Sequence, residues 1–134
     1  MAKIGIKFGI AETVLSVPKL IQLMDTVSGT AVGDLLKLTG VNFVEEITSN
    51  AASEIPNGIF GVAYSKPTTI TVEVIFVGIV GSYSGLAVGD PVFVKADGTT
   101  TQTVPTGAGI VQQIGFAVST TEIFVSLKQA MELI

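Results

Sequence analysis

The chain of 134 residues is long enough to form one domain with a buried core. Its seven basic residues are all lysines, its net charge is −4, and it contains no histidine, cysteine, arginine or tryptophan. Without cysteine, the chain cannot form disulfides or cysteine zinc sites. Without histidine it lacks the commonest general base, and without arginine it lacks the side chain that most often contacts guanine in DNA. The composition therefore indicates a structural or binding protein rather than an enzyme.

The surface is expected to carry few charges, because only 13% of the residues are charged and the mean hydropathy is +0.67. Small soluble monomers normally have a more charged surface, so we expect partners to bury part of this one. An uncharged surface rich in glycine, serine and threonine is the alternative. An acidic chain with scattered lysines predicts no partner among nucleic acids or anionic membranes. The apolar run Val74–Val80 is too short for a membrane-spanning helix, and the N-terminus lacks a signal peptide, which predicts synthesis in the cytoplasm.

The N-terminal segment, residues 1–27, is predicted to be an arm followed by a short helix or a further extended stretch. Residues Lys3–Ile10 alternate in polarity and place Ile4, Ile6 and Phe8 on one side, which is typical of a strand or an extended arm. Residues 16–25 could form about two helical turns or remain extended.

The clearest predicted strand is Thr69–Val77, with residues of alternating polarity in its first half. Its inward face is predicted to carry Ile70, Val72 and Val74. Beyond Val74 both faces are apolar, and a strand that is apolar on both faces is buried on both. We therefore expect the second face, with Ile75 and Val77, to meet another chain or a covering segment.

Further strands and turns follow the same pattern of short alternating runs between glycines and prolines. Additional strands are predicted at Leu35–Leu38, Ile59–Ala63, Pro91–Lys95 and Thr121–Leu127. Asp97-Gly98 is predicted to supply the positive φ angles of a tight hairpin, and Pro56–Gly58 forms a turn before its strand. The last seven residues, 128–134, are predicted as a short helix or an extended arm.

An internal repeat is the most specific feature of the sequence. Ser28–Asp34 matches Ser84–Asp90 at six of seven positions, and each copy leads into a predicted strand. Further along, residues 61–65 parallel residues 115–119. Two copies are too few for a solenoid, which needs at least three.

The repeat predicts the fold class. We expect an all-β protein, a compact β-barrel or sandwich built from two similar β units, with an extended N-terminal arm and at most short helices. The β-barrel domain is placed at residues 28–134, with the two units at 28–74 and 84–127.

The repeated Gly33-Asp34 and Gly89-Asp90 pairs are the candidates for chemistry. Two equivalent aspartates could form a metal or acid–base pair, but nothing else in either motif is ionisable. We interpret each glycine as a positive-φ turn residue and each aspartate as an acceptor for backbone N–H groups at a strand entry. The glycine-rich stretches lack a dinucleotide fingerprint, and no nucleophile–base pair is evident. No catalytic residue, cofactor or metal site is predicted.

The second half of the chain resembles a known family of virion proteins. The resemblance is carried by Gly85–Val94, Asp97–Thr99, Gly115–Val118 and Ile123–Leu127. This succession of turn glycines and strands resembles the β-barrel modules of tailed-phage capsid decoration (cement) proteins, and it extends over roughly Ser28 to Leu127. Some head-fibre and tail-fibre proteins share the layout.

The resemblance implies a mechanical function on the outer surface of a phage capsid. Such proteins bind expanded heads, often as trimers, and bridge neighbouring subunits of the major capsid protein. The expected partners are therefore the major capsid protein and further copies of this chain, with Ile4, Ile6, Phe8, Ile75 and Val77 as suspected contacts. The alternatives are a head-fibre, tail-fibre or baseplate protein, or a non-viral small-molecule-binding β-barrel.

Overall fold

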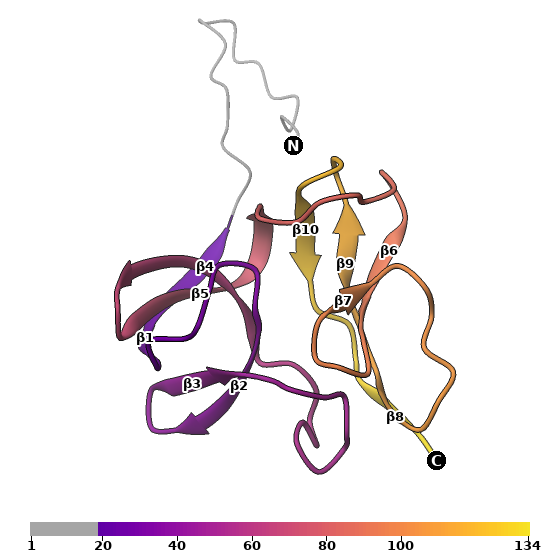
Figure 1. Ribbon diagram of the computed structural model, residues 1–134, viewed down its shortest axis with the longest axis horizontal. Helices are drawn as coiled ribbons and strands as arrows, with labels where there is room; N and C mark the ends of the chain where they lie inside the picture. The colour runs from indigo at the N-terminus through magenta and orange to yellow at the C-terminus, as the bar shows by residue number, and fades with distance from the viewer. Residues whose placement is uncertain (1–18) are drawn as a thin grey trace, which may run out of the picture.

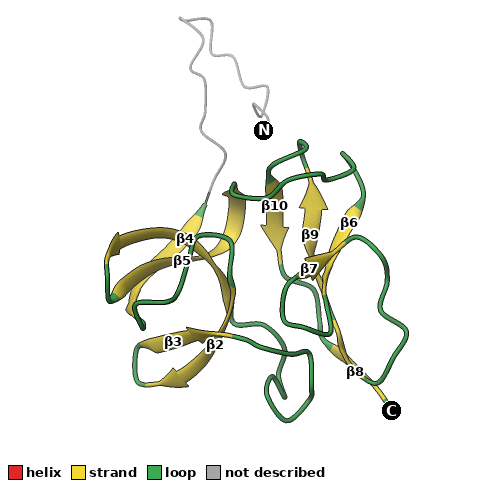
Figure 2. Cartoon of the chain, viewed as in Figure 1, coloured by secondary structure: helices red, strands yellow, loops and turns green. Residues whose placement is uncertain are grey.

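The computed structural model describes residues 19–134, which form eleven strands and no helix (Figure 2). The strands are β1 (Leu20–Asp25), β2 (Leu35–Gly40), β3 (Phe43–Glu46), β4 (Gly61–Thr68), β5 (Thr71–Val80), β6 (Pro91–Val94), β7 (Thr100–Thr101), β8 (Gly109–Val111), β9 (Gln113–Ala117), β10 (Ile123–Ser126) and β11 (Met131–Leu133). The predicted all-β class is confirmed. The suspected contacts Ile4, Ile6 and Phe8 lie outside the described residues. Residues 19–134 contain no helix that is long and apolar enough to cross a membrane.

The first five strands close into a barrel, seen in indigo to magenta in Figure 1. Their order is β1-β3-β2-β4-β5, and β1 also pairs with β5 along its whole length, which completes the ring. The bridge between β1 and β3 is a single parallel pair, Asp25 with Phe43. The barrel interior is filled by small and medium apolar side chains: Met24, Leu36, Val44, Ala63, Val72 and Val74.

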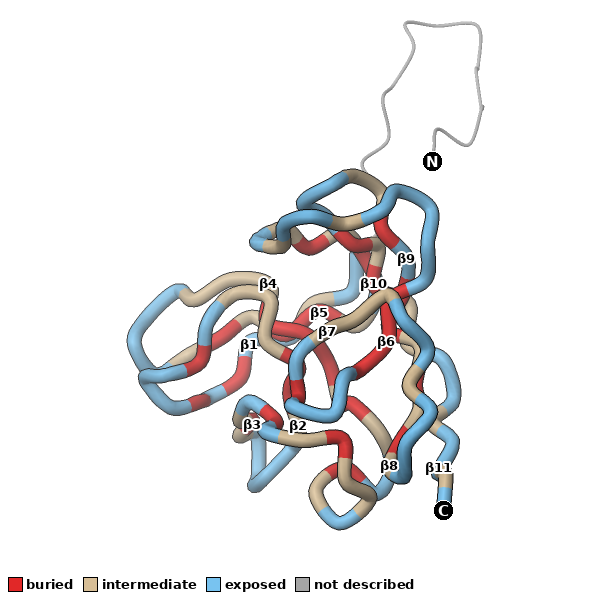
Figure 3. The backbone as a smooth tube through the Cα atoms, turned by 45° about the vertical axis from the view of Figure 1, so that its right-hand side comes forward, coloured by how far each residue is buried: buried red, intermediate tan, exposed pale blue. Residues whose placement is uncertain are grey.

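β5 joins two groups of strands within one nine-stranded sheet, because its C-terminal part continues into a second group ordered β5-β10-β9-β6-β7. We call β1–β5 the first unit, and the C-terminal part of β5 with β6, β7, β9 and β10 the second unit. Val72 and Val74 face the barrel interior, whereas Ile75 and Val80 lie in a larger core to which both units contribute. Buried backbone accordingly runs through the middle of the molecule in Figure 3.

The chain itself therefore explains why both faces of β5 carry apolar residues. This face was expected to meet another chain or a covering segment, and the second unit of the same chain covers it, with Ile75 fully buried there. The prediction that Ile75 contacts another protein is wrong, since its side chain has no surface to offer. Val77, two residues on, is 38% exposed and remains available to a partner.

The sequence repeat is also a structural repeat, with matching backbone hydrogen bonds in the two units. Gly33 N donates to Ala63 O at 2.8 Å and Gly89 N donates to Ala117 O at 2.8 Å. In return, Ala63 N donates to Asp34 O at 2.9 Å and Ala117 N donates to Asp90 O at 3.0 Å. The strand register agrees, because Leu36 faces Gly61 as Val92 faces Gly115.

The structure decides two alternatives that the sequence left open, at both ends of the described chain, and corrects one expectation, at Ile70. The stretch up to Asp25 is extended rather than helical from Leu20 onward, because its apolar side chains pair with β5 in a sheet. Ile70, expected to point inward, lies in the turn between β4 and β5 and is 61% exposed. The C-terminal stretch is likewise extended, and Met131–Leu133 pairs with β8 in a separate two-stranded sheet (Figure 3).

Candidate functional site

The two repeated glycines have the conformation that their motifs predict. Gly33 has φ 94° and Gly89 has φ 88°, the left-handed region that other residues avoid. The Asp34 carboxylate accepts a hydrogen bond from Ala31 N at 2.8 Å, as expected at a strand entry. These residues order the loop that leads into β2.

Asp90 does not repeat this contact, and a glutamine takes its place. The Gln102 side chain accepts from Ala87 N at 2.8 Å and donates to Ala87 O at 2.9 Å. It also reaches Asp90 O at 3.4 Å. The predicted role of the Asp90 side chain is therefore wrong, and Gln102 connects β7 to the loop that leads into β6. Neither the glycine pattern nor the spacing singled out Gln102.

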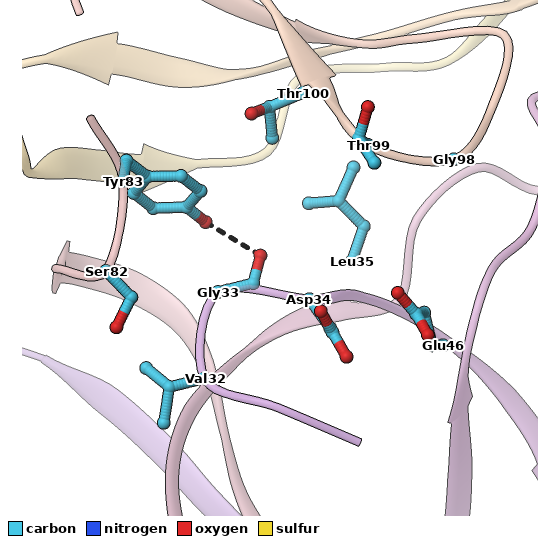
Figure 4. Close-up of a pocket in the computed structure, with 10 residues that line it drawn as sticks. All are labelled: Val32, Gly33, Asp34, Leu35, Glu46, Ser82, Tyr83, Gly98, Thr99 and Thr100. Atoms are coloured by element: carbon cyan, nitrogen blue, oxygen red, sulfur yellow. Dashed lines mark hydrogen bonds between the residues drawn. The ribbon is translucent and has the colours of Figure 1, made fainter. Parts of the chain in front are cut away.

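The residue that corresponds to Gln102 in the first unit is Glu46, 56 positions earlier, the same spacing as in the repeat. Glu46 lies beside Asp34, and partial burial together with the negative charge of Asp34 raises the pKa of the Glu46 carboxyl. The two carboxyl groups line a hollow of about 200 Å³ (Figure 4). Residues 19–134 contain no group of three or more acidic side chains that could hold a metal ion.

Tyr83 closes the other side of this hollow and joins the two units. Its hydroxyl donates to Gly33 O at 2.9 Å, the bond drawn in Figure 4. Burial, with a contribution from the charge of Asp34, raises the pKa of Tyr83 above its ordinary value, so the phenol stays protonated and continues to donate.

The predicted hairpin at Asp97-Gly98 is present, but its geometry differs from the expected one. Only Gly98 has positive φ, at 85°. Asp97 instead accepts hydrogen bonds from Thr99 N at 3.0 Å and Thr99 Oγ1 at 2.5 Å. These bonds lower the pKa of the Asp97 carboxyl. A left-handed glycine after the turn is typical of hairpins with a bulge, and it brings β7 back alongside β6.

The first unit has a seam, which we define as the line where β1 meets β3 and the barrel closes. Asp25 N donates to Asn42 O at 3.0 Å across it. Thr26 Oγ1 donates to Val44 O at 2.7 Å, and the same hydroxyl bonds Thr30 Oγ1 at 2.7 Å. The first barrel is therefore closed by both backbone and buried side-chain bonds.

The corresponding seam of the second unit, between the end of β5 and β7, is not closed by strand pairing. The strand register explains why this seam is open. In the first unit Gln22 pairs with Val74, which also pairs with Ala63; in the second unit Val80 pairs with Ile123, which also pairs with Ala117. Gln22 and Val80 are thus equivalent, as are Ser28 and Ser84.

The connection through the second seam is consequently two residues shorter. Five residues, 23–27, separate the equivalent positions in the first unit, but only three, 81–83, do so in the second. The strand ends before it can reach β7, and no residue stands in the place of Thr26. A second hollow of about 420 Å³ lies here, lined by Ser82–Leu86 and Thr100–Gln102.

This open seam is polar and uncharged. Serine, threonine, glutamine and tyrosine side chains line it together with Leu86, so it can exchange hydrogen bonds but offers no nucleophile–base pair for covalent chemistry. For the small-molecule alternative, it is one of three recesses in the described part of the chain, together with the Asp34–Glu46 hollow and a recess beside Lys37 and Pro56. Comparisons with family models, curated proteins and solved structures found no match to this chain.

A separate surface feature is an apolar row on the outer face of the second unit. Cross-strand pairing places four residues side by side over four strands: Pro91, Phe116, Phe124 and Ile79. The rings of Phe116 and Phe124 lie 5.5 Å apart, and Phe116 is 41% exposed. Val77 extends the row along β5 and pairs with Leu20, which is 60% exposed. We call these six residues the apolar row.

Proposed function

We propose that this chain is a structural virion protein that binds the outer surface of a tailed-phage capsid and stabilises the shell. It bridges subunits of the major capsid protein and acts as a homotrimer. The observation that carries the proposal is the apolar row, an uncharged exposed surface on a rigid sheet. The resemblance of its turn and strand pattern to capsid decoration proteins supplies the partner.

The apolar row has the properties of a protein contact surface. Contiguous apolar side chains on a soluble protein mark an interface, whereas single ones do not. Aromatic residues such as Phe116 and Phe124 supply the buried anchors of most interfaces. Their cross-strand pairing holds them in one geometry, so binding costs little conformational entropy.

The fold suits a protein that resists mechanical force on a shell and carries out no reaction. The first unit is a closed barrel, which leaves few free strand edges, and the two units share one continuous core. Modest contacts that repeat over a shell add up through avidity. The N-terminal segment, residues 1–10, supplies a further contact by adding a strand to a neighbour's sheet.

The test is binding to expanded heads of the phage that encodes the chain. The full chain should sediment with the heads, and coated heads should retain their genome at higher temperature than uncoated ones. Phe116→Glu places a charge in the apolar row and should reduce binding. Val104→Glu, at an apolar residue that is 54% exposed outside the row, is the matched control and should bind normally.

Two results would contradict the proposal. One is that the unsubstituted chain does not bind heads; the other is that Phe116→Glu and Val104→Glu bind equally well. Deleting residues 1–10 should weaken binding and leave the circular dichroism spectrum of the β fold unchanged. Binding at a tail tip or along a fibre would instead identify the chain as another virion component.

A further inference from the structure

We propose that the open seam of the second unit receives an extended strand from a second copy of this chain, namely residues 3–10. The inference deepens the proposed function by naming where the N-terminal segment binds. It starts from the contrast between the two units: the same fold is closed at the first seam and open at the second.

The edge of β7 is suited to accept a strand. Lys95 N donates to Thr99 O at 2.7 Å, so Thr99 directs its carbonyl to the β6 side. Antiparallel strands alternate, and Thr100 therefore directs its N–H and C=O away from β6, towards the seam. An edge with free backbone groups pairs readily with an added strand.

The first unit shows how a backbone group that faces the seam finds a hydrogen-bond partner. The carbonyl of Val44, 56 positions before Thr100, faces the closed seam and accepts the Thr26 hydroxyl. The shorter second seam supplies no such residue, and the hollow of about 420 Å³ occupies its place. A strand bound there would provide the missing backbone partners for β7.

The edge is held ready for binding. Gln102 connects the end of β7 to the loop at Ala87 and Asp90, and the Lys95–Thr99 turn fixes its start. Because β7 is already positioned at both ends, little conformational entropy is lost when a strand pairs with it.

The sequence contains a segment suited to this edge outside residues 19–134. As an added strand, residues 3–10 would place apolar side chains on one face and Gly5, Lys7 and Gly9 on the other. The glycines allow close approach of the backbone to the polar seam, and the apolar face is left to pack outward.

The length of the intervening chain favours exchange between copies. Residues 11–18 separate the strand from Lys19, which lies beside Gly78 on β5. Fully extended, these eight residues span about 26 Å, enough to reach a neighbour in contact. Pro18 lacks a backbone donor, which disfavours continuing β1 directly along β5 into the chain's own seam.

The absence of cysteine makes a direct test possible in the full chain. Lys7→Cys is purified separately and mixed with Ser84→Cys under mild oxidation. Ser84 lines the open seam and is exposed. The matched control is Ser28→Cys, since Ser28 is the exposed equivalent of Ser84 beside the closed seam. Disulfide-linked dimers should form several-fold faster with Ser84→Cys than with Ser28→Cys.

A second variant tests the backbone contact. Thr100→Pro removes the N–H that faces the seam, at an edge where proline is tolerated, and should slow the cross-link in the Ser84→Cys background. Equal dimer yields with Ser84→Cys and Ser28→Cys would overturn the proposal. So would a double variant, Lys7→Cys with Ser84→Cys, that cross-links only within one chain. The assay contains no phage heads, so its failure is distinguishable from a failure to bind the shell.

Discussion

Neutralising Glu54 should destabilise the protein at neutral pH and have little effect in acid. Glu54 lies in the long connection between β3 and β4, and its side chain is only 12% exposed. Its carboxylate accepts hydrogen bonds from Thr48 N at 2.7 Å, from Ser49 Oγ at 2.8 Å and from Lys37 Nζ at 3.1 Å. Although partial burial opposes ionisation, these bonds together lower the pKa of Glu54 to about 2.

The size of the effect follows from that pKa. A fall from 4.5 to about 2 is worth at most about 3.5 kcal/mol of folding free energy, at about 1.4 kcal/mol per pH unit. Water at the rim of the site screens these interactions, so we expect about 1–2 kcal/mol. Because the folded pKa is the lower one, this stability is present above pH 4.5 and is lost as the pH falls towards 2.

Urea unfolding of the full chain at several pH values measures this directly. Glu54→Gln keeps the volume of the side chain and should lower the free energy of unfolding by about 1–2 kcal/mol at pH 7. The deficit should shrink as the pH falls below 4.5. Glu132→Gln, an exposed residue of β11, is the control and should change stability little. Two results would refute this expectation: Glu54→Gln as stable as the unsubstituted chain at pH 7, or a loss of stability near pH 2.5 as large as that at pH 7.

The remaining predictions concern the joint between the two units and the self-association. Ile75→Ala should cost about 2–5 kcal/mol, because this fully buried side chain fills the shared core, whereas Val77→Ser should stay within about 0.5 kcal/mol in urea unfolding yet weaken self-association. Tyr83→Phe should cost about 1 kcal/mol through loss of the bond to Gly33 O, and an unchanged unfolding midpoint would contradict that role. Glu46→Gln copies Gln102 of the other unit and removes a carboxyl whose pKa is raised; it should stabilise the fold above pH 4.5 and not below it, and a destabilised variant would contradict the pairing with Asp34. Light scattering of the full chain should give about 41 kDa, three times the chain mass of 13.8 kDa, and a monomer at every concentration would count against the trimer.

The β class and the repeat were predictable because both depend on local chemistry. Alternation requires strands, and the glycines before Asp34 and Asp90 mark positive φ angles that few other residues adopt. Asn42 occupies the position in the first unit that Gly98 occupies in the second, and it also has a positive φ, 53°. The sequence pattern did not indicate this turn, because the residue there is asparagine and not glycine. The repeat could thus be found where its turn residues are alike and missed where they differ.

The long-range features could not be read from local patterns. The apolar residues of Val74–Val77 showed that both faces of β5 are covered, but not that the chain itself covers Ile75. Ile70 continues the alternation yet falls in the turn before β5, because polarity does not mark the first residue of a strand. The open seam depends on a difference of two residues between otherwise unlike segments, which becomes visible only through the strand register.

The proposed function requires the chain to bind the outside of a phage shell through the face that carries the apolar row. Cryo-electron microscopy of expanded heads mixed with the full chain would show this binding. We predict added density on the outer surface at three-fold positions or capsomer junctions, with Phe116 and Val77 facing the shell or a neighbouring copy. Heads that carry no added density at saturating concentrations of the chain would contradict the proposed function.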